Sequence, residues 1–284
     1  MEHQIYFVEG IPGSGKTTRV KELKNLFIQK GKNVVCIEEC EKNPLDLSRC
    51  AILTQTEYEC LKEEITMNIQ ADPQKIGKLL QILETVSEYS NDAVYVFFQS
   101  LFEKKELNSI AMALCTRDVY NGHYSFKKFR EEHLKRWRIF SSSTHEEDTV
   151  YICDAILLQS PLFELMGYYE LSEDSIVQYT SELISCIKDM SPMIYYNRVF
   201  DVPTAMKYTC SCRKKANDRW EQGFYKWMES SPYCQRHNYH GFDGMCTFLA
   251  KRQALELQIL KRLNVPICLS NSNEKISQYI TLLE

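Results

Sequence analysis

The stretch from Gly10 to Thr17, which reads Gly-Ile-Pro-Gly-Ser-Gly-Lys-Thr, constrains this chain more than any other segment. It matches the pattern G-x-x-x-x-G-K-[ST] at every fixed position, and loops of this pattern cradle phosphates with their backbone N–H groups. A short β-branched and aromatic run at residues 5–8 precedes it, and residues 18–27 carry apolar side chains at helical spacing. A strand, a glycine-rich loop and a helix in this order predict a phosphate site. The alternative is a plain glycine turn between strand and helix.

The residue types in this loop suit a bound triphosphate. Glycines let the backbone wrap an anion without Cβ clashes, and the start of the helix adds its positive dipole end. Lys16 is predicted to reach the β- and γ-phosphates, and Thr17 is predicted to ligate Mg²⁺. The predicted nucleotide contacts are Gly10, Pro12, Gly13, Ser14, Gly15, Lys16, Thr17 and Thr18.

The composition narrows the class of protein. The chain has 284 residues, of which 44% are hydrophobic, and this suits one large α/β domain or one domain with a long insertion. A net charge of −4 lacks the basic signature of a nucleic-acid or anionic-membrane binder. The twelve cysteines are scattered, as in a reducing compartment, and the N-terminus does not resemble a signal peptide. We therefore expect a cytoplasmic monomer or homodimer that binds neither nucleic acid nor membrane.

The apolar run that ends at Asp154 is the second segment with chemical meaning. Residues 149–153 are largely apolar, and an acid directly after such a strand is typical of a Walker B metal site. Asp154 either holds Mg²⁺, directly or through water, or acts as the general base toward an acceptor hydroxyl. Gln159 and Ser160 are predicted acceptor contacts. Further core strands are predicted at 5–8, 33–37, 192–196 and 266–269, which gives a mostly parallel five-stranded sheet.

Acidic residues follow the strand at 33–37. Ligands of open parallel sheets lie beyond the carboxyl ends of the strands. If this strand neighbours the first one, a carboxylate here faces the phosphate-transfer centre. Glu39 is the preferred candidate and Asp46 the second, and a solvated acidic loop is an equally good interpretation.

Two further regions are assigned from their patterns. Residues 55–145 contain several amphipathic helical patterns and are predicted to be a helical insertion that covers the acceptor site. The densest basic cluster of the chain runs from Arg213 to Arg219, inside a region at 203–245 that we expect to be a mobile lid. A solvated helix surface is the alternative interpretation of this cluster.

Together these features resemble the P-loop kinases of the nucleoside and nucleotide kinase group, and most of all their thymidylate kinase-like members. The resemblance rests on residues 8–18, on the acidic, proline-containing segment after the second strand, and on the apolar strand ending at Asp154. Residues 201–203, followed by Arg213 and by 218–221, are similar to the arginine-bearing lid of that family.

The resemblance implies a P-loop NTPase fold with three α/β/α layers over the whole chain, 1–284. It also implies an enzyme that uses ATP and Mg²⁺ to phosphorylate a small molecule. The expected acceptor is a nucleoside, a nucleotide or a related hydroxyl compound. Lys16, Arg213 and Arg219 would stabilise the transferring phosphoryl group, and Glu39 or Asp154 would orient the acceptor. The alternative function is an ATP-hydrolysing switch or a regulatory nucleotide-binding protein.

One departure from the family pattern concerns an arginine, and a candidate metal site is a separate question. Many of these kinases carry an Asp-Arg pair after the third strand, but Ala155 follows Asp154 here, so the substrate-binding arginine is unassigned among Arg117, Arg130 and Arg136. Some kinase lids hold a structural zinc, which requires four nitrogen or sulfur ligands. The lid-like region offers Cys210, Cys212, Cys234, His237, His240 and Cys246, although unrelated side chains are the preferred interpretation.

Overall fold

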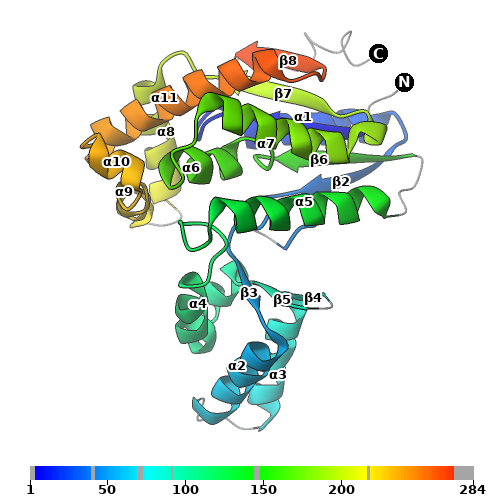
Figure 1. Cartoon of the computed structure of the whole chain (residues 1–284), viewed down its shortest axis with the longest axis vertical. Helices are drawn as coiled ribbons and strands as arrows, with labels where there is room; N and C mark the ends of the chain where they lie inside the picture. Colours follow the sequence, from blue (N-terminus) through cyan, green and yellow to red (C-terminus); the bar gives the residue numbers. More distant parts are fainter. Residues whose placement is uncertain are drawn as a thin grey trace. The chain divides into compact units, whose positions relative to one another are not determined.

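The computed structural model describes residues 4–39, 42–68, 73–90, 92–143, 148–215 and 218–271. The chain divides into two compact units (Figure 1). The second unit spans Glu39–Phe129, and the first unit combines the segments on either side of it.

A parallel sheet is the centre of the first unit. Its five strands follow the order β2-β6-β1-β7-β8, and each pair of neighbours is parallel. This confirms the five-stranded parallel sheet predicted from the sequence. β6 lies between β2 and β1, so the second strand of the chain is not the neighbour of the first. The strands are β1 (Ile5–Glu9), β2 (Asn33–Ile37), β6 (Thr149–Asp154), β7 (Met193–Arg198) and β8 (Ile267–Asn271).

Alternate side chains of β1 reach helices on opposite faces of the sheet, as the strand period of two requires. The ring of Tyr6 lies 4.8 Å from that of Phe27, which belongs to α1 (Lys16–Gln29). The ring of Phe7 stacks on Trp137 at 5.5 Å, and Trp137 belongs to α5 (Phe126–Ser142). The sheet is therefore buried between helical layers in an α/β arrangement, which explains why its strands are almost continuously apolar.

Further helices complete the first unit. α7 (Glu173–Cys186) contacts α5 through the rings of Tyr179 and His133. α11 (Gly241–Arg262) reaches the end of β7 through the hydrogen bond from Tyr196 Oη to Glu256 Oε2. No helix among the described residues is long and apolar enough to cross a membrane. The remaining helices are α6 (Gln159–Gly167), η3 (Lys188–Met190), α8 (Val202–Lys214), α9 (Trp220–Glu229) and α10 (Pro232–Arg236).

The second unit has its own sheet and its own core. β3 (Cys50–Leu53), β5 (Val94–Phe97) and β4 (Ser87–Tyr89) form an antiparallel sheet in the order β3-β5-β4. Apolar side chains of this sheet and of the adjoining helices form one buried cluster. The helices are α2 (Gln55–Asn68), α3 (Pro73–Thr85), η1 (Gln99–Glu103), η2 (Lys105–Leu107) and α4 (Asn108–Cys115).

The description of this region as a helical insertion is therefore incomplete. The helical patterns at 55–68 and 73–85 do form α2 and α3, but the region also contains a sheet. β3 and β4 have four and three residues, which is too short for an alternating pattern to be visible in the sequence. β3 pairs with β5 across about forty residues of chain, and tertiary packing decides this pairing, whereas β4 and β5 form a local hairpin.

Candidate functional site

The glycine-rich loop joins β1 to α1 with three glycines in the left-handed half of backbone space. The φ angles are +136° at Gly10, +83° at Gly13 and +86° at Gly15, where side-chain-bearing residues are strained. The amide of Ser14 donates to the carbonyl of Ile11 at 3.1 Å, which closes a tight turn within the loop. The backbone therefore takes the wrapped course that its glycine spacing predicts.

The predicted nucleotide contacts divide by exposure. Lys16 is 8% exposed, and its Nζ donates to the carbonyl of Ile11 at 3.2 Å, so the ammonium group lies across the loop. The helix starts at Lys16, so its positive end lies at the loop. Gly10 and Ser14 are buried and Pro12 is half-buried, whereas the exposed members are Gly13, Gly15, Thr17 and Thr18.

The carboxyl ends of β7 and β8 support the loop from one side. A Cβ atom on Gly10 would lie 2.5 Å from the carbonyl oxygen of Asn197. The side-chain amide of Asn197 donates to the carbonyl of Ser14 at 3.2 Å, and its oxygen accepts from Ser270 Oγ at 2.7 Å. Only glycine allows this close approach, which fixes the loop against the ends of two strands.

Helix α8 covers the loop at Gly13. A Cβ atom there would lie 2.4 Å from Thr209 Oγ1 and 3.2 Å from the carbonyl of Ala205. Positions four apart share a helix face, so Arg213 continues the stripe of Ala205 and Thr209 one turn further on. Arg213 is exposed, and its guanidinium carbon lies 5.6 Å from the ring of Trp220. The start of the lid-like region is thus packed directly on the glycine-rich loop.

Asp154 and Thr17 carry a carboxylate and a hydroxyl group at the same edge of the sheet. Asp154 ends β6 opposite Val8 of β1, and the loop begins directly after β1. Asp154 is half-buried, and Thr17 is exposed in the first turn of α1. A carboxylate and a hydroxyl group are hard oxygen donors, which suit Mg²⁺ when phosphate oxygens and water complete its coordination. The donor set at this edge therefore fits the predicted ion.

Glu9 is a residue of this site that our sequence analysis missed. It is fully buried at the end of β1, and it accepts backbone hydrogen bonds from Leu157 at 2.7 Å and from Gln159 at 3.0 Å. These two N–H groups belong to the segment that follows Asp154, where Ala155 has a φ of +63°. Glu9 therefore ties the end of β1 to the segment after Asp154. An acidic residue ending a buried strand immediately before the glycines was a sequence signal for such a role.

Burial strongly raises the pKa of the Glu9 carboxyl. Loss of solvent raises the pKa of Glu9 from 4.5 to about 8, opposed by the N–H groups of Gln159 and Leu157 and reinforced by the nearby carboxylate of Glu256. Glu256 is itself fully buried, and it accepts from Tyr196 Oη at 2.5 Å and pairs with Arg252 Nε at 3.0 Å. The two buried acids are thus held by backbone N–H groups, by a tyrosine hydroxyl and by an arginine.

The premise of the Glu39 prediction is wrong. Glu39 follows β2, but β6 separates β2 from β1, because the second strand of the chain takes an outer position in the sheet. Glu39 is half-buried and begins the second unit. Asp46 is 1% exposed, and its carboxylate accepts from Tyr120 Oη at 2.6 Å, from Ser48 Oγ at 2.5 Å and from the amide of Leu47 at 2.8 Å. These bonds give Asp46 a structural explanation within the second unit.

Two of the three candidate arginines form local ion pairs, and the third is buried. Arg117 forms an ion pair with Glu57 in the second unit. Arg130 donates from Nε and Nη2 to the two carboxylate oxygens of Glu182, each at 2.7 Å. Arg136 is 7% exposed. The structure therefore does not single out a substrate-binding arginine among them.

The downstream acceptor candidates lie in the segment held by Glu9. Gln159 is 9% exposed, and its backbone N–H is one of the two groups that donate to Glu9. The amide of Ser160 donates to the carbonyl of Ala155 at 3.1 Å. Both residues thus begin α6 close to the end of β6, and their contact with an acceptor stays a prediction.

The cysteines and histidines of the lid-like region are scattered. Cys210, Cys234 and Cys246 are buried, whereas Cys212 is exposed. His237 Nδ1 lies 2.9 Å from the carbonyl of Tyr233. Within the described ranges, no three His, Cys, Asp or Glu side chains gather as a metal site would require.

One curated protein supports a relationship to nucleotide kinases. It is 37% identical to this chain over 85 residues, which are 28% of this chain and 40% of the relative. The relative is a thymidylate kinase of Buchnera aphidicola subsp. Baizongia pistaciae (strain Bp). No family model matches the chain. The chain thus spans well under two thirds of the matched thymidylate kinase, and the similarity indicates a nucleotide kinase-like relationship for part of the molecule.

Proposed function

We propose that the chain is an ATP-dependent phosphotransferase that acts on a small-molecule acceptor, with a nucleoside or nucleotide as the first class to test. The observation that carries the proposal is the conformation of the Gly10–Thr17 loop. Three glycines with positive φ turn the loop between a buried parallel strand and a helix N-terminus. Such a loop binds phosphate because backbone N–H groups and the helix dipole both favour an anion.

The residues around the loop suit phosphoryl transfer. Lys16 would offset charge on the β- and γ-phosphates, and Thr17 and Asp154 would hold Mg²⁺, which neutralises phosphate charge when bound. The acceptor hydroxyl would form the new P–O bond as the bond to ADP breaks, and its proton would pass to Asp154 or to water. Arg213 and Arg219 would meet the developing charge from the lid-like region. The exposed position of Arg213, on the face of α8 that covers Gly13, supports this part of the proposal.

The test pairs a loop variant with a control from the same helix. Lys16→Ala should lower phosphoryl transfer by at least ~10³-fold, since it removes the positive charge that offsets the phosphates. Asp154→Asn should lower it by at least ~10²-fold, since it removes the carboxylate that holds Mg²⁺ or accepts the proton. Lys21→Ala, which changes an exposed lysine of α1, should leave the rate unchanged. Each purified protein would be assayed with Mg-ATP and a panel of nucleosides, nucleotides and other hydroxyl compounds, with the phosphorylated product identified by mass spectrometry.

Two results would count against the proposal. Near-wild-type transfer by Lys16→Ala would remove the loop from the mechanism. ATP hydrolysis that no acceptor stimulates would favour the switch or regulatory nucleotide-binding function instead.

A further inference from the structure

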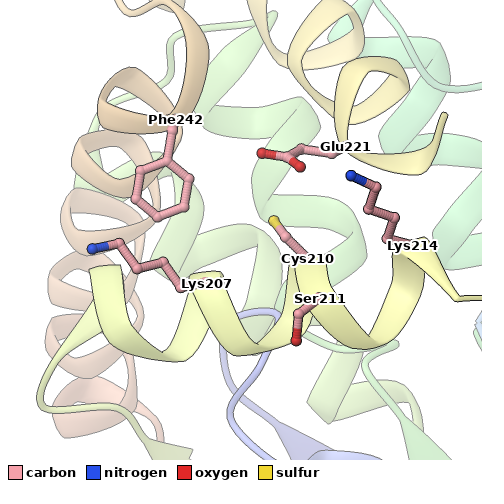
Figure 2. Close-up of a pocket in the computed structure, with 6 residues that line it drawn as sticks. All are labelled: Lys207, Cys210, Ser211, Lys214, Glu221 and Phe242. Carbon is pink, nitrogen blue, oxygen red and sulfur yellow. The ribbon is translucent and has the colours of Figure 1, made fainter. Parts of the chain in front are cut away.

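Two faces of helix α8 have different neighbours. One face carries Ala205 and Thr209, which lie against Gly13 of the glycine-rich loop. At 100° per residue, Lys207, Cys210 and Lys214 fall on the opposite half of the helix. They face a hollow of about 280 Å³ that Ser211 of α8, Glu221 of α9 and Phe242 of α11 also line. Figure 2 shows these side chains around the hollow on one side of α8.

The middle of the hollow is apolar. The thiol of Cys210 points into it, and the ring of Phe242 forms a wall (Figure 2). Burial raises the pKa of the Cys210 thiol, so this group is neutral at pH 7. The hydroxyl of Ser211 donates to the carbonyl of Tyr208 at 2.8 Å and is already satisfied. A hydrocarbon or aromatic body would therefore gain contacts here without burying unpaired polar groups.

The rim of the hollow carries an excess of positive charge. Lys207 Nζ lies 6.0 Å from the centre of the Phe242 ring, and Lys214 lies toward the other end of the hollow. Across the described part of the chain, neither lysine has a carboxylate within 4.0 Å. Glu221, the acidic member of the lining, accepts a hydrogen bond from Tyr225 Oη. Among the lining residues, two ammonium groups and one carboxylate leave one positive charge for an anionic ligand group, which the carboxylate of Asp201 offsets in part at Lys207.

We propose that this hollow binds a small carboxylate with an apolar body, and that binding alters the affinity of the glycine-rich loop for nucleotide through α8. The carboxylate would lie at the open rim, where the flexible side chains of Lys207 and Lys214 can turn toward it, and the body would lie on Phe242 and Cys210. A Cβ atom on Gly13 would meet Thr209 Oγ1 at 2.4 Å, so no side chain fits between α8 and the loop, and a shift of this helix moves a wall of the loop. Binding of the carboxylate in the hollow does not depend on the proposed function. Its effect on nucleotide affinity does rest on the proposed function.

The probe for the site is 2-naphthoate, and the uncharged control is 2-naphthamide. Calorimetric titration without nucleotide should show naphthoate binding with a Kd near ~1 mM or tighter, the range typical for a ligand of this size. The amide should bind at least ~5-fold more weakly. Lys207→Ala and Lys214→Ala should each weaken naphthoate by ~3-fold or more, and both lysines are exposed, so the fold should tolerate the changes. Lys226→Ala, an exposed lysine of α9 outside the hollow, should have no effect.

The coupling is measured by repeating the titrations with Mg-ATP. Naphthoate should change the apparent affinity for ATP by ~3-fold or more, and ATP should change the affinity for naphthoate by the same factor, because linkage is reciprocal. Absence of naphthoate binding, equal binding of the amide, or full binding by both lysine variants would overturn the site. Naphthoate binding with an unchanged ATP affinity would overturn the coupling. Failure of the wild type to bind Mg-ATP at all would instead reject the proposed function, and the titration without nucleotide would still decide the site.

Discussion

At the scale of single residues, Glu9 links the two segments from which a phosphate site would be built. Its carboxylate leaves the end of β1, one residue before the glycines, and holds the backbone after Asp154. A fully buried acid is costly unless hydrogen bonds satisfy it. The carboxylate of Glu9 therefore satisfies two buried backbone N–H groups and holds the segment after Asp154 in one conformation.

Glu9→Gln tests this link. Glutamine offers one acceptor oxygen, so the amide of Leu157 or of Gln159 would face an NH₂ group instead. An unsatisfied buried donor costs about 1–3 kcal/mol, and the free energy of unfolding measured with urea at pH 5 should fall by this amount.

The deficit of Glu9→Gln should shrink as the pH rises. Burial raises the pKa of Glu9 from 4.5 to about 8, so the unfolded state releases a proton over this interval before the folded state does. The wild type therefore loses stability as the pH rises from about 4.5 to about 8, and the variant lacks this loss. Urea titrations of both proteins at pH 5 and pH 8 check the trend. A deficit that grows over this range would contradict it.

At the scale of elements, α8 and the glycine-rich loop behave as one packed unit. The loop depends on glycine at Gly13 for two separate reasons, a positive φ and the closeness of Thr209. Gly31 has a similar φ of +78°, but a Cβ atom added there would meet no described atom within 4 Å. A substitution at Gly31 therefore measures backbone strain alone, whereas one at Gly13 measures strain together with the contact with α8.

Gly13→Ala and Gly31→Ala form the matched pair. Gly31→Ala should cost about 1–2 kcal/mol of unfolding free energy, the strain of a left-handed alanine. Gly13→Ala should cost more and should also weaken Mg-ATP binding by ~10-fold or more, because α8 must move away from the loop. Thermal unfolding and equilibrium binding of a fluorescent ATP analogue measure the two effects.

A second substitution distinguishes a clash from strain. Thr209→Ala removes the Oγ1 atom that a Cβ on Gly13 would approach to 2.4 Å. In the Gly13→Ala background it should therefore restore part of the lost ATP affinity, as coupling between contacting residues requires. If the two changes are simply additive, the contact between α8 and the loop has no energetic role.

At the scale of the whole molecule, each unit carries its own buried acid. In the second unit, Asp118 is 1% exposed and accepts from the amide of Tyr120 and from Asn121 Nδ2, each at 3.2 Å. Burial raises the pKa of Asp118 from 3.8 to about 7, with the carboxylate of Asp46 adding to the effect. Its protonated form resembles asparagine in shape.

Asp118→Asn should flatten the pH dependence of stability. The unfolded acid ionises near pH 4 and the folded acid near pH 7, so the wild type loses stability as the pH rises through this range. The variant should become relatively more stable by roughly 4 kcal/mol between these limits, about 1.4 kcal/mol for each pH unit. Chemical unfolding at half-unit pH steps, followed by circular dichroism, tests this. A variant that loses stability relative to wild type as the pH rises would refute the assignment.

Local patterns predicted the elements of the first unit well. The strands around Phe7, Ile152 and Tyr195 are buried on both faces and therefore appear in the sequence as short apolar runs. Asp201, two residues before Pro203, is an equally local signal for the start of a helix, and its carboxylate accepts from the amide of Thr204 at 3.0 Å. The antiparallel sheet of the second unit escaped because β3 and β4 are short and β3 pairs with β5 about forty residues further along the chain.

The sequence by itself determined the glycine-rich loop, the strands and helices that flank it, and the acid at the end of β6. These features are local, since φ preferences and apolar periodicity act over a few residues. Only the tertiary structure decided that β6 separates β2 from β1, that Glu9 holds the segment after Asp154, and that α8 covers Gly13. Strand order and helix docking depend on how much apolar surface each arrangement buries, and that quantity belongs to the folded chain as a whole.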